Sequence, residues 1–267
     1  MKHKCGFIGC GNMGGALAKA VAKSISPNEI LISDKDSKKV ADFSDEIGVS
    51  VGSSIDVASE CEYIFLGVKP QLLGVVFDEI RPSLEARKDS VVLVSMAAGI
   101  SIKKIKELSG GEYPTIRIMP NMPASVGEGM ILYCIDGVSS AQTDGFLQLM
   151  SKAGKLCGLD EKLIDAGSAV SGCGPAFAFM FIEALADGGV QCGLPRDKST
   201  LLAAQTLLGA SSMVLQSGVH PEALKDAVCS PGGTTIEGVH ALESGGFRAS
   251  AAEAVIAAYK RTLELGK

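Results

Sequence analysis

The sequence predicts an α/β N-terminal domain with a mostly parallel sheet, followed by an all-α C-terminal domain. Three observations support this: a glycine-rich turn follows the first apolar strand, strands and helices alternate up to about Leu159, and long apolar helices then replace the alternation. Strands that alternate with helices form a parallel sheet with helices on both faces. We therefore divide the 267 residues into domains 1–159 and 160–267.

The first element is a predicted strand over Lys4 to Ile8, and the sequence Gly-Cys-Gly-Asn-Met-Gly at residues 9–14 leads from it into a predicted helix. This order is typical of a Rossmann-like dinucleotide-binding domain. Gly9 permits a tight turn, Gly11 lets a pyrophosphate approach the backbone, and Gly14 lets helix and strand pack closely. The alternative is a glycine-rich turn that holds no ligand.

A second predicted strand, Glu29 to Ser33, ends at an acidic residue, Asp34. In dinucleotide-binding domains the carboxylate that bonds the ribose 2′-hydroxyl lies about 20 residues beyond the last glycine, which is the place of Asp34. A carboxylate there repels a 2′-phosphate and favours NADH. Lys35 could instead pair with that phosphate and admit NADPH, so the choice of cofactor stays open.

The alternation continues along the rest of the first domain. Loops rich in small residues and proline follow three of the predicted strands, at 68–70, 95–99 and 119–123. Ligands sit at the carboxyl ends of parallel strands, so these loops are candidates to line a nicotinamide pocket, or are only strand-ending turns. The predicted strands are 63–68, 90–94, 115–119, 130–135 and 155–158, and the predicted helices 72–84, 102–108 and 141–152.

No convincing strand follows residue 159. Helices are predicted over 174–192, 195–216 and 220–229, from about Thr234, and over 247–265. Segments such as Leu201-Leu202-Ala203-Ala204 make them apolar around much of their girth, and such helices need burial on most sides. A second copy of the chain would bury this surface best, which predicts a dimerisation domain; a compact monomeric bundle is the alternative.

The stretch from Ser230 reads Ser-Pro-Gly-Gly-Thr-Thr, and Ile236, Val239 and Leu242 then recur at helical spacing. Proline and glycine mark a tight turn, so a helix begins near Thr234 or Thr235 with open N–H groups. Such a helix start favours an anion. We expect it to hold a small carboxylate beside the Thr235 hydroxyl, the alternative being an ordinary capped turn.

Composition excludes several function classes. The net charge is −5 with no basic run, which argues against nucleic acid as a partner. The 8 cysteines form no Cys-x-x-Cys pair and there are only 3 histidines, so no metal site is expected. Scattered thiols suit the cytoplasm. Glycines, Asn12 and Lys19 interrupt the N-terminal apolar stretch, which disfavours a secretion signal. No apolar run approaches the length of about 20 residues that is needed to span a bilayer, so no membrane span is expected.

Several segments in order resemble one enzyme family. They are Gly6 to Gly14, Val68-Lys69-Pro70, Met119-Pro120-Asn121, Ser171 to Ala176, and Ser230 to Thr235 with Leu242 to Arg248. Together they closely resemble pyrroline-5-carboxylate reductase, a family that makes proline by reducing a cyclic imine with a nicotinamide cofactor. The resemblance covers the whole chain. It implies a Rossmann domain, an interlaced helical dimer and often a ring of dimers, with each active site shared between subunits.

The resemblance also implies roles for individual residues. The substrate carboxylate is expected on Ser230, Gly232, Gly233 and Thr234, and Thr235 is expected to bond the imine nitrogen as the catalytic residue. NADPH or NADH is the expected cofactor. With the loops considered above, the expected cofactor contacts are Gly9, Cys10, Gly11, Asn12, Met13, Ser33, Asp34, Lys35, Ser54, Val68, Lys69, Pro70, Ala97, Ala98 and Asn121.

Three residues depart from the family pattern. Met122 stands where threonine is common, and Ser54 where an adenosine-contacting asparagine is frequent. Asp34 stands where a residue friendlier to a 2′-phosphate often sits. The last departure puts the usual preference for NADPH in doubt and favours NADH.

A cyclic imine is electrophilic once its nitrogen is protonated, so hydride transfer needs orientation more than a strong acid. This chemistry suits an anchoring loop without His, Cys or Lys. The rival prediction is a 3-hydroxyacid dehydrogenase of the hydroxyisobutyrate type, which needs a group to handle the hydroxyl proton. That family places a lysine four residues after a helix-opening glycine, and here the position is Ala178. A nucleotide-sensing protein without catalysis is a second alternative.

Overall fold

The computed structural model describes residues 2–265, which form two compact units. One unit extends to Gly172 and also includes the chain from Tyr259 onward; the other is Cys173–Ala258. This division by compactness falls later than the predicted boundary after residue 159, because helix α7 (Glu161–Ser171) packs with the sheet. The functional boundary itself stays a prediction.

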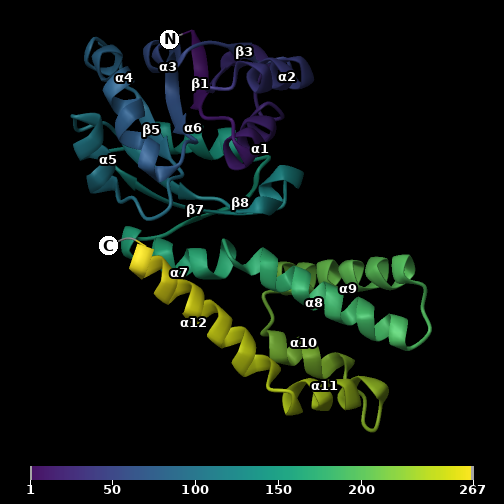
Figure 1. The fold of residues 1–267 in the computed structure, drawn as a ribbon. Helices are drawn as coiled ribbons and strands as arrows, with labels where there is room; N and C mark the ends of the chain where they lie inside the picture. The colour runs from purple at the N-terminus through teal and green to yellow at the C-terminus, as the bar shows by residue number, and fades with distance from the viewer. Residues whose placement is uncertain (1, 266–267) are drawn as a thin grey trace. The chain divides into compact units, whose positions relative to one another are not determined.

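The first unit is built on one eight-stranded sheet with the order β3-β2-β1-β4-β5-β6-β7-β8 (Figure 1). Neighbouring strands are parallel except β6 and β7, which confirms the mostly parallel sheet. The chain order reverses at β1, which lies between β2 and β4. The strands are β1 (His3–Ile8), β2 (Ile30–Ser33), β3 (Ser50–Val51), β4 (Cys61–Leu66), β5 (Val92–Ser95), β6 (Thr115–Met119), β7 (Gly129–Asp136) and β8 (Gly154–Gly158).

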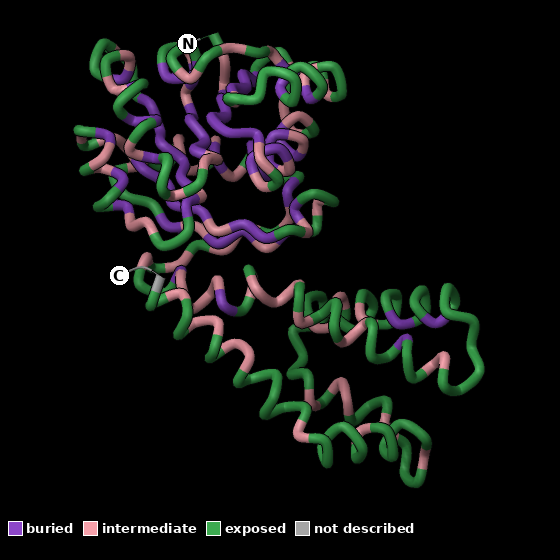
Figure 2. Tube along the Cα trace, viewed as in Figure 1, coloured by how far each residue is buried: buried purple, intermediate pink, exposed green. Residues whose placement is uncertain are grey.

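Helices cover both faces of this sheet. Alternate strand residues point to opposite faces, so Phe7 joins one core cluster and Ile8 the other. The Phe7 cluster includes side chains of α1 (Asn12–Val21), α2 (Ser37–Ile47) and α6 (Ser140–Met150). The Ile8 cluster includes side chains of α3 (Ser54–Glu60), α4 (Leu73–Glu85) and α5 (Ile102–Ser109). Figure 2 shows the buried trace concentrated inside this unit.

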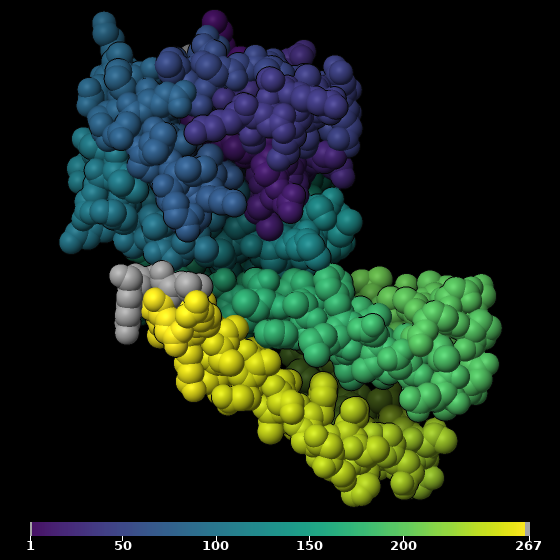
Figure 3. Space-filling view, in the orientation of Figure 1, coloured from purple at the N-terminus to yellow at the C-terminus, as the bar shows by residue number. Residues whose placement is uncertain are grey.

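Sequence analysis missed the short elements after β2. Helix α2 buries only Val40 and Phe43, and β3 has two residues, so neither carries a clear periodic signal. Helix α3 has seven residues and begins with a capping box in which Ser53 and Asp56 bond each other's backbone N–H groups. The 3-10 turns η1 (Pro27–Glu29), η2 (Pro70–Leu72) and η3 (Met122–Val126) complete the unit. Helix α1 is in contact with η3. In Figure 3 the purple surface of the N-terminal residues adjoins teal surface from later in the same unit.

Helix α7 was also missed, and a buried cation holds it to the sheet. Arg117 on β6 is only 3% exposed, and its guanidinium donates to Asp165 Oδ1 at 2.7 Å. Glu161, at the start of α7, lies 3.5 Å from the same guanidinium. Ile164 packs beside Leu132 in a third small core cluster. The sequence signal was weak because α7 buries only Ile164 and Ala169.

The second unit is entirely helical, as predicted. Helices α8 and α9 are in contact along their length, and α11 starts where the sequence indicated. Among the described residues of Cys173–Ala258, only Ala186, Ser199 and Ala203 are fully buried. Most of this unit is exposed (Figure 2). Its exposed residues include leucines and methionines along α8 and α9, which give it a large apolar surface. The helices are α8 (Gly174–Gln191), α9 (Arg196–Ser217), α10 (Pro221–Val228), α11 (Thr234–Ser244) and α12 (Phe247–Leu265).

One stretch of the chain qualifies as a membrane span by its length and average composition alone. Within the described residues, the continuous helical stretch Glu161–Gln191 is long and apolar enough to span a bilayer, with a mean hydropathy of 1.5. Small residues and phenylalanines raise its average, although no unbroken apolar run is present. Only 11% of its most apolar window is buried inside the chain, so this surface needs another cover.

Phe7 provides a test of the sheet core. It is fully buried and stacks on Phe65 with ring centroids 4.5 Å apart. We predict that Phe7→Ala lowers the free energy of unfolding by about 3–5 kcal/mol, because it leaves a cavity between sheet and helix. The measurement is urea unfolding followed by circular dichroism at one fixed protein concentration.

The matched control is Val75→Ala on α4, where the side chain is 55% exposed. Its effect should stay within about 0.5 kcal/mol. Equal effects of the two substitutions would contradict the assignment of Phe7 to the core.

Candidate functional site

Three backbone segments meet where β1 and β4 end. Gly9 has φ 96°, a left-handed conformation, and a Cβ built on it would lie 2.8 Å from the carbonyl carbon of Gly67. A Cβ on Gly14 or on Gly67 would lie far closer to the Gly9 carbonyl oxygen than the van der Waals contact distance allows. The turn after β1, the first turn of α1 and the end of β4 therefore approach one another only because all three positions are glycine.

Gly11 is a glycine for a different reason. A Cβ built on it meets nothing within 4 Å, so packing inside the protein does not require glycine there. Gly11 is also the N-cap of α1 and no side chain caps this helix start. Open space in front of unpaired N–H groups fits an anion such as a pyrophosphate.

A crevice of about 420 Å³ opens beside this turn. It lies at the carboxyl ends of β1, β2 and β4, where the strand order reverses, as expected for a nucleotide site in such a sheet. Seven of the predicted cofactor residues line it: Gly9, Gly11, Ser33, Asp34, Lys35, Ser54 and Val68.

Asp34 is fixed in this crevice by its neighbours. Its Oδ2 accepts the Cys10 N–H at 2.7 Å, and its Oδ1 accepts the Asp36 N–H at 3.1 Å. The carboxylate is thus held beside the glycine turn, at the position where the ribose hydroxyls of a dinucleotide would lie. Lys35 is exposed, and the Ser33 and Ser54 hydroxyl oxygens lie 3.3 Å apart on the crevice wall.

Cys10 contributes only its backbone. Its side chain is 1% exposed, and burial, reinforced by the Asp34 carboxylate, raises the pKa of the thiol to about 12. The thiol is therefore neutral at physiological pH and is not a nucleophile. Its N–H group, predicted to contact the cofactor, is already bonded to Asp34.

The other predicted cofactor residues do not line this crevice. Asn121 is 8% exposed, and both ends of its amide are used inside the protein: Nδ2 donates to the Ser171 carbonyl at 2.8 Å, and Oδ1 accepts the Met130 N–H at 2.9 Å. Ala97 is 2% exposed within the core. These two side chains have a structural role here. The remaining residues outside the crevice are Asn12, Met13, Lys69, Pro70 and Ala98.

Several residues of the crevice were missed by sequence reasoning. Gly67 directly follows the apolar run of β4. A glycine at the end of a strand could have predicted that another backbone segment approaches closely there. Leu72, Val76 and Glu79 lie along one face of η2 and α4 at helical spacing, although nothing in the pattern shows that this face points to a ligand. Gly52 and Ser53 belong to the short elements that the sequence analysis did not identify.

In the helical unit, the loop from Ser230 forms a tight turn. The Gly233 N–H donates to the Ser230 carbonyl at 3.0 Å, and Gly232 has φ 66°. Proline at the second position and a left-handed glycine at the third are the signature of a type II turn. A Cβ at Gly233 would collide with the Ser230 hydroxyl and lie 3.1 Å from the Ser230 carbonyl oxygen, so a side chain there would displace the Ser230 side chain.

Helix α11 begins directly after this turn, and the N–H groups of its first turn are not capped. Gly233 is the N-cap, and no side chain caps the helix. Thr234 and Thr235 are exposed, and neither hydroxyl has a hydrogen-bond partner among residues 2–265. An uncapped helix start with two free hydroxyls can accept a carboxylate, and it directly follows the turn that contains Ser230, Gly232 and Gly233. Substrate binding by these residues and by Thr234 and Thr235 stays a prediction.

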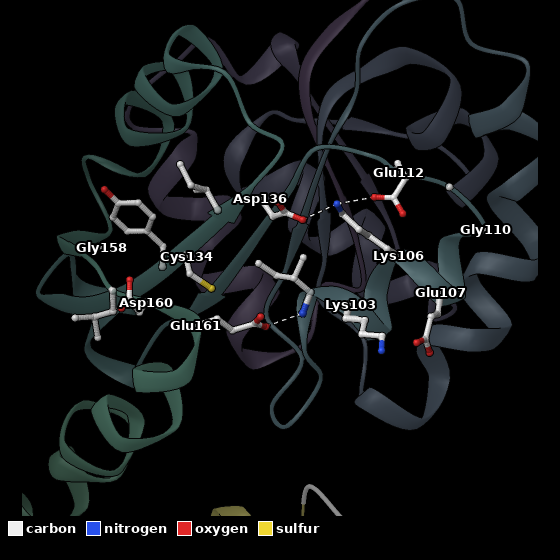
Figure 4. A pocket seen from close by; sticks show the side chains of 15 residues that line it. Lys103, Lys106, Glu107, Gly110, Glu112, Cys134, Asp136, Gly158, Asp160 and Glu161 are labelled. Atoms are coloured by element: carbon white, nitrogen blue, oxygen red, sulfur yellow. Dashed lines mark hydrogen bonds and ion pairs between the residues drawn. The ribbon is translucent and has the colours of Figure 1, made fainter.

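A larger hollow of about 1230 Å³ lies elsewhere in the sheet unit, between α5, β7 and the start of α7 (Figure 4). Its charged groups are mostly satisfied by one another. Lys106 pairs with Glu112 and Asp136, and Glu161 accepts the Ile102 N–H at 2.7 Å. We assign no chemistry to this hollow, because its size comes from an open surface and not from convergent free polar groups.

Comparison with known families matches both parts of the chain. Residues 161–265 match the family model described as pyrroline-5-carboxylate reductase dimerisation. Residues 4–99 match the family model described as NADP oxidoreductase, coenzyme F420-dependent. The first match begins beside the predicted domain boundary and covers the loop at Ser230.

Full-length relatives carry the same family name. The chain is 44% identical to pyrroline-5-carboxylate reductase of Arabidopsis thaliana, over 99% of this chain and 96% of the relative. It is 41% identical to the Escherichia coli protein of that name over 100% of both.

Solved structures agree with these relatives. The structure of a pyrroline-5-carboxylate reductase from Coxiella burnetii superposes with a TM-score of 0.91 at 31% identity over 100% of both chains. The Plasmodium falciparum pyrroline carboxylate reductase, solved with NADP bound, gives 0.85 at 34% identity over 100% of both. The sequence resemblance is therefore confirmed, and the chain belongs to the pyrroline-5-carboxylate reductase family.

Proposed function

We propose that this chain reduces 1-pyrroline-5-carboxylate to L-proline with NADPH or NADH, the last step of proline biosynthesis. The observation that carries the proposal is that one chain holds a candidate site for each reactant: an open dinucleotide crevice at Gly9–Gly14 and an uncapped carboxylate-binding helix start at Thr234. Relatives with this name, 41–44% identical over the full length, support the same activity.

The residues of the crevice fit a nicotinamide dinucleotide. The open space at Gly11 accommodates the pyrophosphate, and Asp34 can accept hydrogen bonds from ribose hydroxyls. When bound, the cofactor supplies a hydride. The protein's part is to hold the dinucleotide in a fixed orientation.

Binding of the substrate depends on the N–H groups at the start of α11. They bind the ring carboxylate and so fix the distance and direction of the C=N bond. The imine nitrogen first takes a proton. The hydride that a bound cofactor would supply can then add to the imine carbon, as the C=N π electron pair moves to nitrogen. Thr235 is not acidic enough to be a strong proton donor, but its free hydroxyl can orient the nitrogen and relay a proton to it.

The residues argue against the rival dehydrogenase. Oxidation of a 3-hydroxyacid requires a side chain that takes the hydroxyl proton, and the position where the rival family has lysine is Ala178 on α8. A nucleotide-sensing protein without catalysis would not need the carboxylate-binding helix start at Thr234. Reduction of an imine explains both the absence of a lysine at Ala178 and the presence of the carboxylate-binding helix start.

The C-terminal region is a dimerisation domain, and we propose that it forms a homodimer that shares each active site between subunits. Exposed side chains such as Leu201, Leu202 and Leu208 would then be covered by a second copy. The same explanation applies to the apolar stretch Glu161–Gln191. It carries five charged residues and is better covered by protein than by lipid; they are Glu161, Lys162, Asp165, Glu183 and Asp187.

We further propose assembly of dimers into a ring, and a cytoplasmic location. All eight cysteines are free, which suits a reducing compartment. The proposals of activity and assembly are tested by steady-state assays with 1-pyrroline-5-carboxylate and each reduced cofactor, and by light scattering during gel filtration.

The first prediction separates the two kinds of glycine. Gly11→Ala should leave folding unchanged but weaken cofactor binding by about tenfold or more, since its methyl enters the open space in front of α1. Gly14→Ala should instead lower the melting temperature, because its methyl collides with the Gly9 carbonyl. Cofactor titration by fluorescence and thermal unfolding are the measurements. Identical behaviour of the two variants would contradict this reading of the turn.

The second prediction concerns Thr235. Thr235→Ala should reduce kcat on the order of 10²-fold, because it removes the hydroxyl beside the imine nitrogen, whereas Thr235→Ser should stay within about fivefold of wild type. Ser244→Ala, which removes an exposed hydroxyl at the far end of the same helix, is the matched control and should leave kcat unchanged. Wild-type turnover by the Thr235→Ala variant would remove this residue from the mechanism.

The third prediction concerns cofactor choice. Asp34→Ser should raise the ratio of kcat/KM for NADPH to that for NADH by about tenfold, because a negative charge near the 2′-phosphate is lost. Asp34→Asn keeps an oxygen for the Cys10 N–H and separates the effect of charge from that of the hydrogen bond. Asp45→Ser, an exposed change on α2, is the control. An unchanged ratio in both Asp34 variants would assign the choice to Lys35 or another group.

A further inference from the structure

An ion-pair network joins three helices around the carboxylate-binding loop. Arg248, in the first turn of α12, lies between two acidic residues: its Nη2 is 2.7 Å from Glu222 Oε1, and its Nε donates to Glu243 Oε1 at 2.6 Å. Glu222 is also paired with Lys225, whose Nζ lies 2.7 Å from Oε2. A single guanidinium thus connects α10 with α11.

The position of this connection matters for the loop. Helices α10 and α11 are joined by residues 229–233, so the loop is one end of this helix pair. Glu222 lies in the first turn of α10 and Glu243 in the last turn of α11, at the opposite end. At 1.5 Å per helical residue, Glu243 lies on the order of 10 Å along the axis from the N–H groups of Thr234 and Thr235.

Within one chain, apolar side chains do little to join this helix pair. Ile236 and Leu242 on α11 are 38% and 42% exposed, and Val228 at the end of α10 is 63% exposed. A hollow of about 600 Å³ is lined by Lys225 of α10 and by residues 236–243 of α11. Polar contacts therefore carry much of the connection between the two helices.

The network is charged at all physiological pH values. Hydrogen bonds from Lys225 and then Arg248 lower the pKa of Glu222 to about 2, so its carboxylate does not take up a proton in the working range. The arginine matches its two partners through different nitrogens, which a lysine could not do in the same way.

We propose that Arg248 is a positioning residue for recognition of the substrate carboxylate. By binding Glu222 and Glu243 together, it fixes the direction of α11 relative to α10 and so the direction in which the first N–H groups of α11 point. Arg248 does not touch the substrate in this arrangement. This inference rests on the proposed function of the Ser230 loop.

The test is the kinetics of Arg248→Gln with 1-pyrroline-5-carboxylate. Exposed ion pairs are individually weak, so the effect should be moderate. We expect the KM for the imino acid and the inhibition constant of proline to rise together by about three- to tenfold, with the KM of the cofactor within about twofold of wild type. Glu222→Gln should behave similarly, and the double variant should lose no more than Arg248→Gln alone, because the two act through one contact.

Two comparisons separate positioning from general stability. Reduction of 1-pyrroline, the same ring without the carboxylate, should be equally slow in the wild type and in Arg248→Gln. Arg261→Gln, which breaks an exposed pair with Glu264 on the same helix, should leave all constants unchanged. Arg248→Lys should lie between Arg248→Gln and the wild type.

The outcomes are distinct. An Arg248→Gln variant with a lower melting temperature but an unchanged KM for the imino acid would overturn the inference and leave the proposed function intact. Should that variant fail to fold, Glu222→Gln with wild-type constants would overturn it in the same way. Absence of turnover in the wild type with either cofactor would overturn the proposed function and this inference with it.

Discussion

The close approach of Gly9, Gly14 and Gly67 is the constraint on which the nucleotide crevice depends. With any side chain at these positions the turn after β1 could not lie against the end of β4, and α1 could not start directly above the sheet. The same contact brings β2 and Asp34 to the mouth of the crevice through the Cys10 N–H. Backbone geometry therefore sets the site, and the Asp34 carboxylate is held at its mouth.

Sequence reasoning predicted the elements that carry strong local signals. The strand Thr115–Met119 and the helix starting at Thr234 were predicted at the residues where they occur. A short segment with three β-branched residues that ends at a proline, and a Pro-Gly-Gly turn, are strong local signals. Helices α2, α3 and α7 were missed since each buries only two apolar residues. Their stability comes from caps and from partners distant in sequence, which no local pattern contains.

The same distinction applies to the site. Gly9 and Gly11 were predictable because their roles follow from a motif of six residues. Asn121 was assigned to the cofactor for its place after a strand, but its amide is occupied by Ser171, which lies 50 positions along the chain. The Arg248 network was likewise invisible in the sequence, since Glu222 and Glu243 become neighbours only when α10 and α11 fold back on each other.

The helical unit contains almost no interior of its own: Ala186, Ser199 and Ala203 are its only fully buried described residues. A fold whose apolar side chains find their cover in a second copy has no well-defined stability as a single chain. By mass action, the fraction of folded molecules then depends on how much of the protein is present. Dilution alone would lower the yield of competent enzyme per chain, so the abundance of the protein becomes a determinant of its specific activity.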